Sequence, residues 1–351
     1  MSNKKLRVMM LTHFDLVPPD DLADQDDPRM TKYQTEHDVR QALLALGHEA
    51  RIVGVGDDLT PVRNAIDEWK PHIAFNLLEE FAGNVALDYY IVSYLEMLKV
   101  PYTGCNPRGL LLSRDKALSK KLLSHHRVPV PLFRTFRWGR TVSAREVRGL
   151  PYPMLVKALL QQGSAGISQA SVVNDADELI HRVVQVQEMT GGDIIAEQFI
   201  EGRELYATVI GNNRLQVLPL RELIFGDQEE GGPRIATYKV KWDEKYRERH
   251  GIDYQFVRTL PAGMTEAIPR LCKRIYRTLD LSGYARIDLR LNQDGKVYVL
   301  DVNANAALSS TEEMALSAEK AGMSYAQFIQ RLLNLGLSAF RNQWPESKSG
   351  E

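Results

Sequence analysis

The chain has 351 residues and a mass of 39.8 kDa, about two to three times the usual domain length, so more than one folding unit is expected. A hydrophobic fraction of 44% and a charged fraction of 25% exclude collagen-like, low-complexity and largely disordered classes. The formal net charge of -1 lacks the basic excess that is typical of nucleic-acid binders. The two cysteines, Cys105 and Cys272, cannot build a disulfide framework. The first apolar run, residues 6–12, is too short for a signal peptide or a membrane span. We therefore expect a cytoplasmic protein that binds neither nucleic acid nor membrane.

Strands and helices alternate in the first part of the chain. Compact apolar runs at 6–12, 49–55 and 72–77 are typical of buried strands, and helical patterns separate them. This alternation predicts an N-terminal α/β domain, residues 1–112, built on a parallel sheet. Residues 18–30, within an acidic and proline-bearing loop, form either a substrate lid or a disordered insertion.

Beyond residue 112 the pattern changes to strands paired by glycine turns, with occasional helices. We place the boundaries of a central lobe at 113–196 and those of a C-terminal lobe at 197–344. The tail, residues 345–351, has no apolar period and is expected to be disordered. The predicted fold class is thus α/β followed by α+β.

Residues 284–303 alternate strictly between apolar and polar side chains around a central Asp-Gly pair, which is a strong signal for a hairpin with a two-residue turn. Such a turn places Asp288 directly opposite Asp301, and Arg286 opposite Asn303. The other face is expected to cover a core with Ile287, Leu289, Leu291, Tyr298, Leu300 and Val302.

The opposed carboxylates of Asp288 and Asp301 repel each other by up to about 1 kcal/mol unless a hard cation lies between them. Together with the amide oxygen of Asn303 they are suitable ligands for Mg²⁺, which completes its coordination with phosphate and water. The alternative is a solvated face on which Arg286 and Arg290 neutralise the aspartates.

A second group of signals could bring a nucleotide to this hairpin. Lys157 lies in an apolar strand and is followed by a glycine- and serine-bearing turn, residues 161–166, which could present N–H groups to phosphate. The turn is equally typical of a mobile hairpin tip. The connector after Glu197 could hold a base and Glu204 could accept from ribose hydroxyls, although a solvated acidic turn fits as well. Residues 238–242 place two lysines on one face of a predicted strand.

Together these segments resemble the ATP-grasp superfamily, specifically its D-alanine–D-alanine ligase-like branch, over nearly the whole chain. The order and spacing of the motifs make the resemblance specific. The motifs are FNLLEEFAGN (75–84), PYTGCN (101–106), SRDKALSK (113–120), LVKALLQQGSAGIS (155–168), IIAEQFIEGREL (194–205), KVKW (239–242), GYARIDLRL and VLDVNAN (299–305). The resemblance implies a two-lobed ATP-grasp fold after the N-terminal domain, ATP and Mg²⁺ (or Mn²⁺) as cofactors, and a homodimer.

The resemblance also implies a role for each matching residue. Arg286 and Lys241 are the implied catalytic residues, with Lys241 near the γ-phosphate and Arg286 near the acyl phosphate. The implied metal ligands are Asp288, Asp301 and Asn303. The implied ATP-binding residues are Lys116, Lys157, Gly163, Ser164, Gly166, Glu197, Gln198, Phe199, Ile200, Glu204 and Lys241. The implied reaction joins a carboxylate to an amine through an acyl phosphate, with ADP and phosphate released.

The substrate side departs from the family pattern. The family carries a glutamate after its first strand, which is missing here. Trp242 replaces a tyrosine, Ala307 stands in place of a glycine, and Glu312 stands near a serine that binds a substrate carboxylate. An acid at Glu312 would favour an amine-bearing partner. We therefore expect small-molecule carboxylate and amine substrates, amino acids or small peptides, other than two D-alanines. An ATP-grasp small-molecule kinase and a non-catalytic ATP-binding protein are the alternatives.

Overall fold

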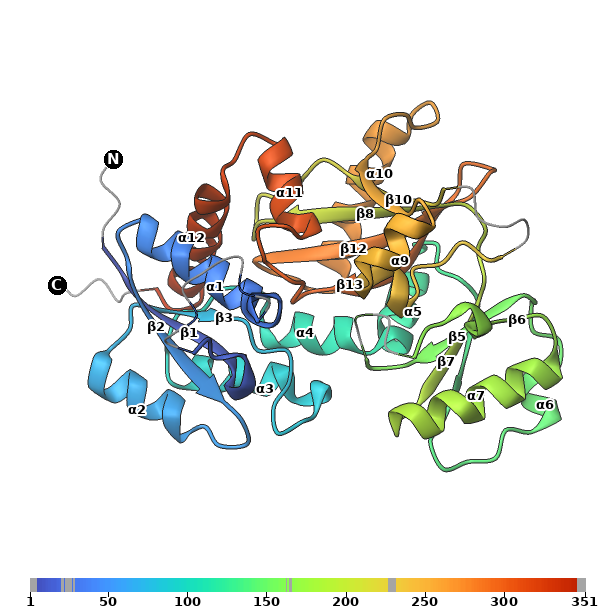
Figure 1. Ribbon diagram of the computed structural model, residues 1–351, viewed down its shortest axis with the longest axis horizontal. Coiled ribbons are helices and arrows are strands. Elements are labelled where there is room, and N and C mark those ends of the chain that lie inside the picture. The colour runs from blue at the N-terminus through green and yellow to red at the C-terminus, as the bar shows by residue number, and fades with distance from the viewer. Residues whose placement is uncertain are drawn as a thin grey trace.

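The computed structural model describes residues 5–19, 22, 27, 29–161, 163, 166–226 and 232–345. Ser164, much of the predicted loop 18–30 and the tail from residue 346 onwards lie outside the described residues. The strands of the described part form three sheets, which the chain builds one after another (Figure 1). Within this part, no helix combines the length and the apolar character that crossing a bilayer requires.

The first sheet is parallel, as predicted, with the strand order β2-β1-β3. Apolar side chains from α1 and α12 pack on one face, and those from α2 and α3 pack on the other. Such two-sided coverage explains why the central strand β1 is buried from Val8 to Thr12. The elements are β1 (Arg7–His13), α1 (Met30–Ala45), β2 (Glu49–Val55), α2 (Thr60–Trp69), β3 (Ile73–Asn76), α3 (Asp88–Met97) and the C-terminal α12 (Tyr325–Gln343).

The second sheet is antiparallel, with the order β4-β7-β5-β6, and α7 packs on one of its faces. Two helices meet at Asp115, because this residue has an extended backbone and ends one helix while its carboxylate caps the next. The elements are α4 (Pro107–Arg114), α5 (Lys116–His125), β4 (Phe133–Phe136), α6 (Ala144–Val147), β5 (Met154–Ala158), β6 (Val172–Val173), α7 (Ala176–Thr190) and β7 (Ile194–Gln198).

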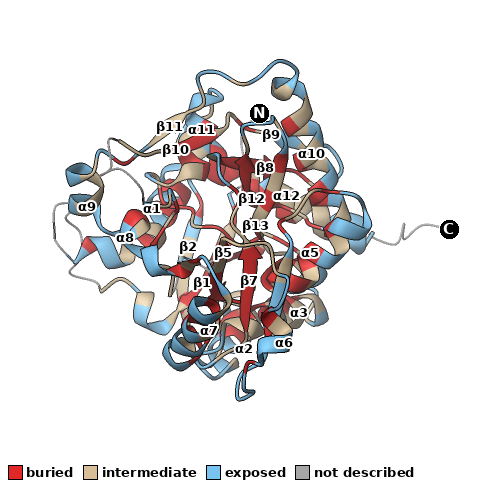
Figure 2. Cartoon of the chain, turned by 90° about the vertical axis from the view of Figure 1, so that its right-hand side faces the viewer, coloured by how far each residue is buried: buried red, intermediate tan, exposed pale blue. Residues whose placement is uncertain are grey.

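The third sheet follows the order β11-β10-β8-β12-β13, with β9 paired to β8. Figure 2 shows β8 and β12 buried at the centre of the molecule, where α10 covers one face. The elements are β8 (Arg203–Ile210), β9 (Gln216–Val217), β10 (Arg221–Ile224), α8 (Tyr238–Trp242), α9 (Glu244–Arg249), β11 (Asp253–Phe256), α10 (Met264–Thr278), β12 (Tyr284–Leu291), β13 (Val297–Asn303) and α11 (Glu313–Lys320).

Residues 238–242 form the short helix α8, so the predicted strand there is wrong. The side chain of Thr237 caps this helix by accepting a hydrogen bond from the Val240 amide at 3.2 Å. Val240 is the buried residue of α8 and packs beside Tyr206 of β8. A buried contact on one side of a capped turn therefore decides the conformation of this segment.

The hairpin of β12 and β13 pairs Asp288 with Asp301 and Arg286 with Asn303, as predicted. The turn is nevertheless one residue longer than predicted, because the amide of Asn292 donates to the carbonyl oxygen of Lys296 at 3.0 Å.

A β-bulge between Asp288 and Leu289 compensates for the longer turn. The extra residue on β13 is Leu300, since Leu289 pairs with Val299 while Asp288 pairs with Asp301. The predicted core face is therefore wrong for part of β13. Val297 and Val299 belong to the core, whereas Tyr298 and Leu300 do not.

Candidate active site

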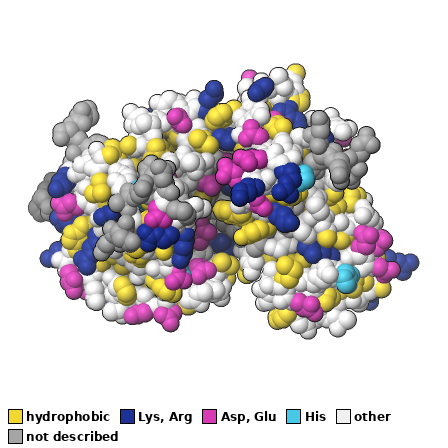
Figure 3. Space-filling view, viewed as in Figure 1, with side chains coloured by type: hydrophobic (Ala, Val, Ile, Leu, Met, Phe, Trp, Pro, Cys, Tyr) yellow, Lys and Arg dark blue, Asp and Glu magenta, His cyan; other side chains and the backbone are white. Residues whose placement is uncertain are grey.

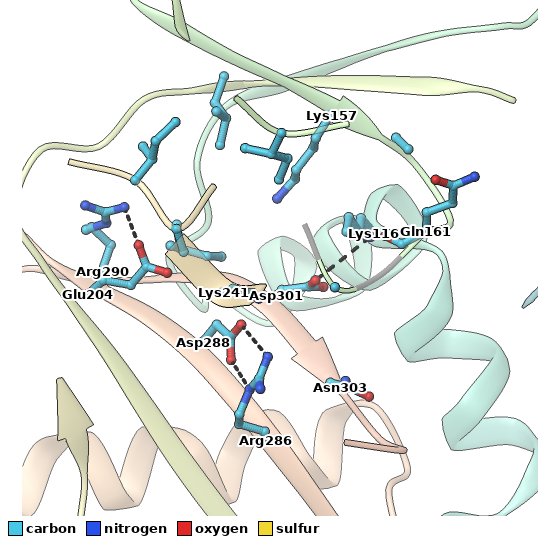
Figure 4. A pocket seen from close by; sticks show the side chains of 17 residues that line it. Lys116, Lys157, Gln161, Glu204, Lys241, Arg286, Asp288, Arg290, Asp301 and Asn303 are labelled. Atoms are coloured by element: carbon cyan, nitrogen blue, oxygen red, sulfur yellow. Dashed lines mark hydrogen bonds and ion pairs between the residues drawn. The ribbon is translucent and has the colours of Figure 1, made fainter. Parts of the chain in front are cut away.

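A cavity of about 730 Å³ opens between β5 of the second sheet and the hairpin of the third (Figure 4). It brings together nine predicted site residues from distant parts of the chain: Lys116, Lys157, Gly163, Glu204, Lys241, Arg286, Asp288, Asp301 and Asn303. The lining also includes residues that were not predicted: Leu155, Ala158, Gln161, Ile167, Ile235, Ala236, Arg290 and Leu300. The predicted residues that do not line it are Gly166, Glu197, Gln198, Phe199, Ile200, Trp242, Ala307 and Glu312.

Asp288 and Arg286 form a two-point ion pair on one wall of the cavity. Arg286 Nε lies 2.8 Å from Asp288 Oδ1, and Arg286 Nη2 lies 3.2 Å from Oδ2. The solvated-face alternative also has Arg286 neutralise an aspartate. That alternative requires solvent-exposed side chains, whereas those of Arg286 and Asp288 are largely buried. Burial raises the pKa of the Asp288 carboxyl despite the nearby guanidinium. The pair therefore lies inside the cavity rather than on a solvated sheet face.

Asp301 faces a group of lysines. Lys116 Nζ lies 3.9 Å from Asp301 Oδ2. Burial alone would raise the pKa of Asp301, but the ammonium groups of Lys116, Lys157 and Lys120 lower this pKa to about 2. Asp301 is consequently a carboxylate at every pH at which the protein would function.

The residues at this point suit a hard divalent cation. Asp288, Asp301 and Asn303 offer only oxygen atoms, the donor type that Mg²⁺ prefers. The Oδ1 atom of Asn303 accepts from the amide of Asn305 at 3.0 Å, and a carbonyl oxygen has a second lone pair. Among the described residues, no cluster of three or more His, Cys, Asp or Glu side chains could hold a metal. Oxygens from a ligand would therefore have to complete the coordination.

Three buried lysines and one buried glutamate link the two lobes. Lys157 Nζ lies 3.1 Å from Glu197 Oε2, and Lys120 Nζ lies 3.4 Å from Glu197 Oε1. Lys116 Nζ donates to the carbonyl oxygen of Gln161 at 2.5 Å, and burial lowers the pKa of Lys116 to about 8. Figure 4 shows Lys157 pointing from β5 towards the strands that carry the aspartates. Such a group of ammonium ions suits a polyphosphate.

A second ion pair closes the opposite end of the cavity. Arg290 Nη2 lies 2.7 Å from Glu204 Oε2, and the hydroxyl of Tyr206 donates to Glu204 Oε1 at 2.8 Å. In the solvated-face alternative Arg290 would neutralise an aspartate, but in the structure it binds Glu204. The sequence could have indicated that Arg290 lines the cavity, because Arg290 lies on the same polar face of β12 as Arg286.

The predicted substrate residues lie outside the cavity. Trp242 lines a larger opening of about 1720 Å³, together with Glu79 and Glu80 at the end of the first sheet. Ala307 lines a neighbouring cavity of about 980 Å³, which the same two glutamates also border. Figure 3 shows a hollow between the left and lower-right parts of the molecule, with acidic side chains along its wall.

Glu36 is an acidic residue of this region that sequence reasoning missed. It lines the cavity beside Ala307 and accepts a hydrogen bond from the hydroxyl of Thr12, at the end of β1, at 2.7 Å. Burial raises the pKa of Glu36. Glu36 comes from the middle of α1, and only the packing of that helix brings its side chain to the end of β1.

Glu312 lies at the start of α11, next to Glu313. Glu313 Oε2 lies 3.4 Å from Arg286 Nη1, so the acidic pair adjoins the predicted catalytic arginine. Burial and the neighbouring Glu313 raise the pKa of Glu312 to about 7. This carboxyl therefore changes its charge close to neutral pH.

Comparison with known proteins agrees with this geometry. Residues 122–334 match the family model of the D-ala D-ala ligase C-terminus. A D-alanine–D-alanine ligase of Desulforudis audaxviator is 31% identical over 295 residues, covering 84% of this chain and 90% of that protein. An uncharacterized protein, y4sG, of Sinorhizobium fredii is 32% identical over 267 residues, covering 75% of this chain and 74% of that protein.

Solved structures of the same fold span nearly the whole chain. The D-alanine–D-alanine ligase of Bacillus anthracis, complexed with ATP, superimposes with a TM-score of 0.72 at 20% identity and covers 96% of this chain and 99% of its own. The VanG D-Ala:D-Ser ligase of Enterococcus faecalis gives a TM-score of 0.69 at 17% identity, covering 95% of this chain and 100% of its own.

Proposed function

Because this chain belongs to the D-alanine–D-alanine ligase family and is an ATP-dependent ligase that forms C–N bonds, we propose that it joins a carboxylate to an amine other than two D-alanines. The substrates are amino acids or small peptides. The carboxylate attacks the γ-phosphate of ATP to give an acyl phosphate and ADP. The amine then attacks that carbonyl and releases phosphate.

The lysines and aspartates of one cavity support the nucleotide part of this proposal. Lys116, Lys157 and Lys241 line it and offset the charge of a triphosphate. Asp288, Asp301 and Asn303 would hold Mg²⁺, which when bound neutralises phosphate charge.

Arg286 supports the ligase chemistry rather than simple nucleotide binding. Asp288 and Glu313 fix its guanidinium from two sides, which leaves it oriented in the cavity beside the metal ligands. A fixed cation at this position can stabilise an acyl phosphate and the oxyanion formed when the amine attacks. This is the observation that carries the proposal.

The substrate part of the proposal depends on Glu312. A carboxylate beside Arg286 repels an acceptor that carries its own carboxylate at that point and attracts one that carries an amine. The acids Glu36, Glu79 and Glu80 in the adjoining cavity have the same preference for a cationic group.

Release of ADP and of free phosphate, measured across amino acids, diamines and dipeptides, tests this function. Equal amounts of both products with a carboxylate and an amine, and an amide product by mass spectrometry, are expected. Robust turnover with D-alanine alone would overturn the substrate assignment. ADP without free phosphate would indicate a kinase, and nucleotide binding without turnover a non-catalytic protein.

A further inference from the structure

The β-bulge at Leu300 decides which face of β13 carries Asp301. Near the turn, paired residues of the hairpin follow the register Leu291 to Val297 and Leu289 to Val299. Continued without interruption, that register would set Leu300 opposite Asp288. Since side chains alternate between the faces of a strand, Asp301 would then point to the other face. One extra residue therefore brings the two aspartates together.

The carbonyl groups at this bulge are held by a side chain from another element. Lys120 of α5 is buried, with only 2% of its side chain exposed. Its Nζ donates to the carbonyl oxygen of Leu300 at 2.6 Å and lies 3.4 Å from that of Val299. A bulge disrupts the ladder locally, so these carbonyls need such a donor.

We propose that Lys120 is a positioning residue that holds the bulge at Leu300 and so keeps Asp301 opposite Asp288 for a divalent cation. This inference rests on the proposed function, because it takes the two aspartates as metal ligands. Lys120 does not line the cavity, so it acts through the backbone of β13.

The third contact of Lys120 extends this role to the second sheet. Its Nζ lies 3.4 Å from Glu197 Oε1, while Glu197 Oε2 binds Lys157. A buried ammonium ion is costly unless hydrogen bonds satisfy it, and here two carbonyls and one carboxylate surround it. The same ammonium thus joins α5, β7 and β13.

The variant Lys120→Met tests the proposal, with Lys121→Met, an exposed neighbour in the same helix, as the control. We expect the Mg²⁺ concentration at half-saturation, measured calorimetrically with ADP, to rise by roughly tenfold or more in Lys120→Met, because loss of an outer-shell partner costs about 10- to 100-fold in metal affinity. Hydrogen exchange of the amides in residues 299–302 should also accelerate without nucleotide. Lys121→Met should change neither quantity.

Hydrogen exchange separates the two contacts of Lys120, one with β13 and one with Glu197 of β7. If the contact with the bulge is the important one, exchange in Lys120→Met accelerates in residues 299–302, whereas faster exchange confined to β7 would assign the effect to the second sheet and overturn the proposal. Should Lys120→Met not fold, Lys120→Gln takes its place with the same expectation. Unchanged Mg²⁺ dependence in a folded neutral variant contradicts the proposal. Absence of Mg²⁺-dependent ADP binding by the wild type would instead contradict the proposed function.

Discussion

The indole Nε1 of Trp242 donates a hydrogen bond to the carbonyl oxygen of Gly163 at 2.9 Å and thereby joins α8 to the loop beside Lys157. Gly163 has a φ of 69°, a conformation that favours glycine. Further along the same loop, Arg182 Nη2 donates to the carbonyl oxygen of Gly166 at 2.8 Å. Separate elements thus hold the described parts of the predicted phosphate loop by its backbone.

Replacing Trp242 by Phe should loosen this loop, because Phe keeps a ring but has no N–H donor. One hydrogen bond contributes about 1 kcal/mol, so we expect the KM for ATP to rise about fivefold. The measurement is ADP release against ATP concentration. Trp138→Phe is the matched control, since Trp138 is also exposed and lies outside the cavity. An unchanged KM in Trp242→Phe would show that the contact does not hold the loop during catalysis.

Replacing Asp301 by Asn should remove a charge that the proposed metal site needs. Loss of one preorganised electrostatic group of this kind typically lowers kcat by about 10²–10³. We expect a fall of that size in ADP release at saturating ATP. Asp294→Asn, at the exposed turn of the same hairpin, should have wild-type activity. Wild-type turnover by Asp301→Asn would contradict the metal site.

Replacing Arg290 by Met should destabilise the protein strongly. The change leaves Glu204 as a buried charge without its partner, and such a loss costs about 3–5 kcal/mol. Chemical denaturation measures the free energy of unfolding. Arg63→Met breaks the exposed ion pair with Asp67, and we expect its effect to stay within about 0.5 kcal/mol. Equal effects of the two variants would show that the buried ion pair contributes no more to the free energy of unfolding than the exposed one.

Replacing Glu312 by Gln should have a pH-dependent effect on stability. Burial raises the folded-state pKa of Glu312 to about 7 from its ordinary value of 4.5. The neutral carboxyl therefore contributes a stability that is fully present below pH 4.5 and is lost as the pH rises through 7. We therefore expect Glu312→Gln to raise the melting temperature at pH 8 and to leave it nearly unchanged at pH 5. Glu319→Gln, exposed on the same helix, should show no such difference. A uniform shift at both pH values would contradict the raised pKa.

The strict alternation over residues 284–303 predicted the hairpin and the pairing of Asp288 with Asp301, but the strands reach that pairing through two departures from the predicted geometry that cancel each other. The turn has one residue more than its Asp-Gly pair indicated, and the bulge at Leu300 adds one residue to β13. The alternation of side chains within the hairpin cannot predict this bulge. The bulge depends on a hydrogen bond from Lys120, which lies far from the hairpin in the sequence.

Short-range patterns of this sequence by themselves determined the parallel first sheet and the hairpin that pairs Asp288 with Asp301. They act between neighbours in the chain, through alternating side chains and turn geometry. Only the tertiary structure decided that residues 238–242 are helical, that Arg290 binds Glu204, and that Glu36 reaches the end of β1 from α1. These features depend on burial and on hydrogen bonds between distant segments. Their free energy outweighs local propensity once the sheets pack together.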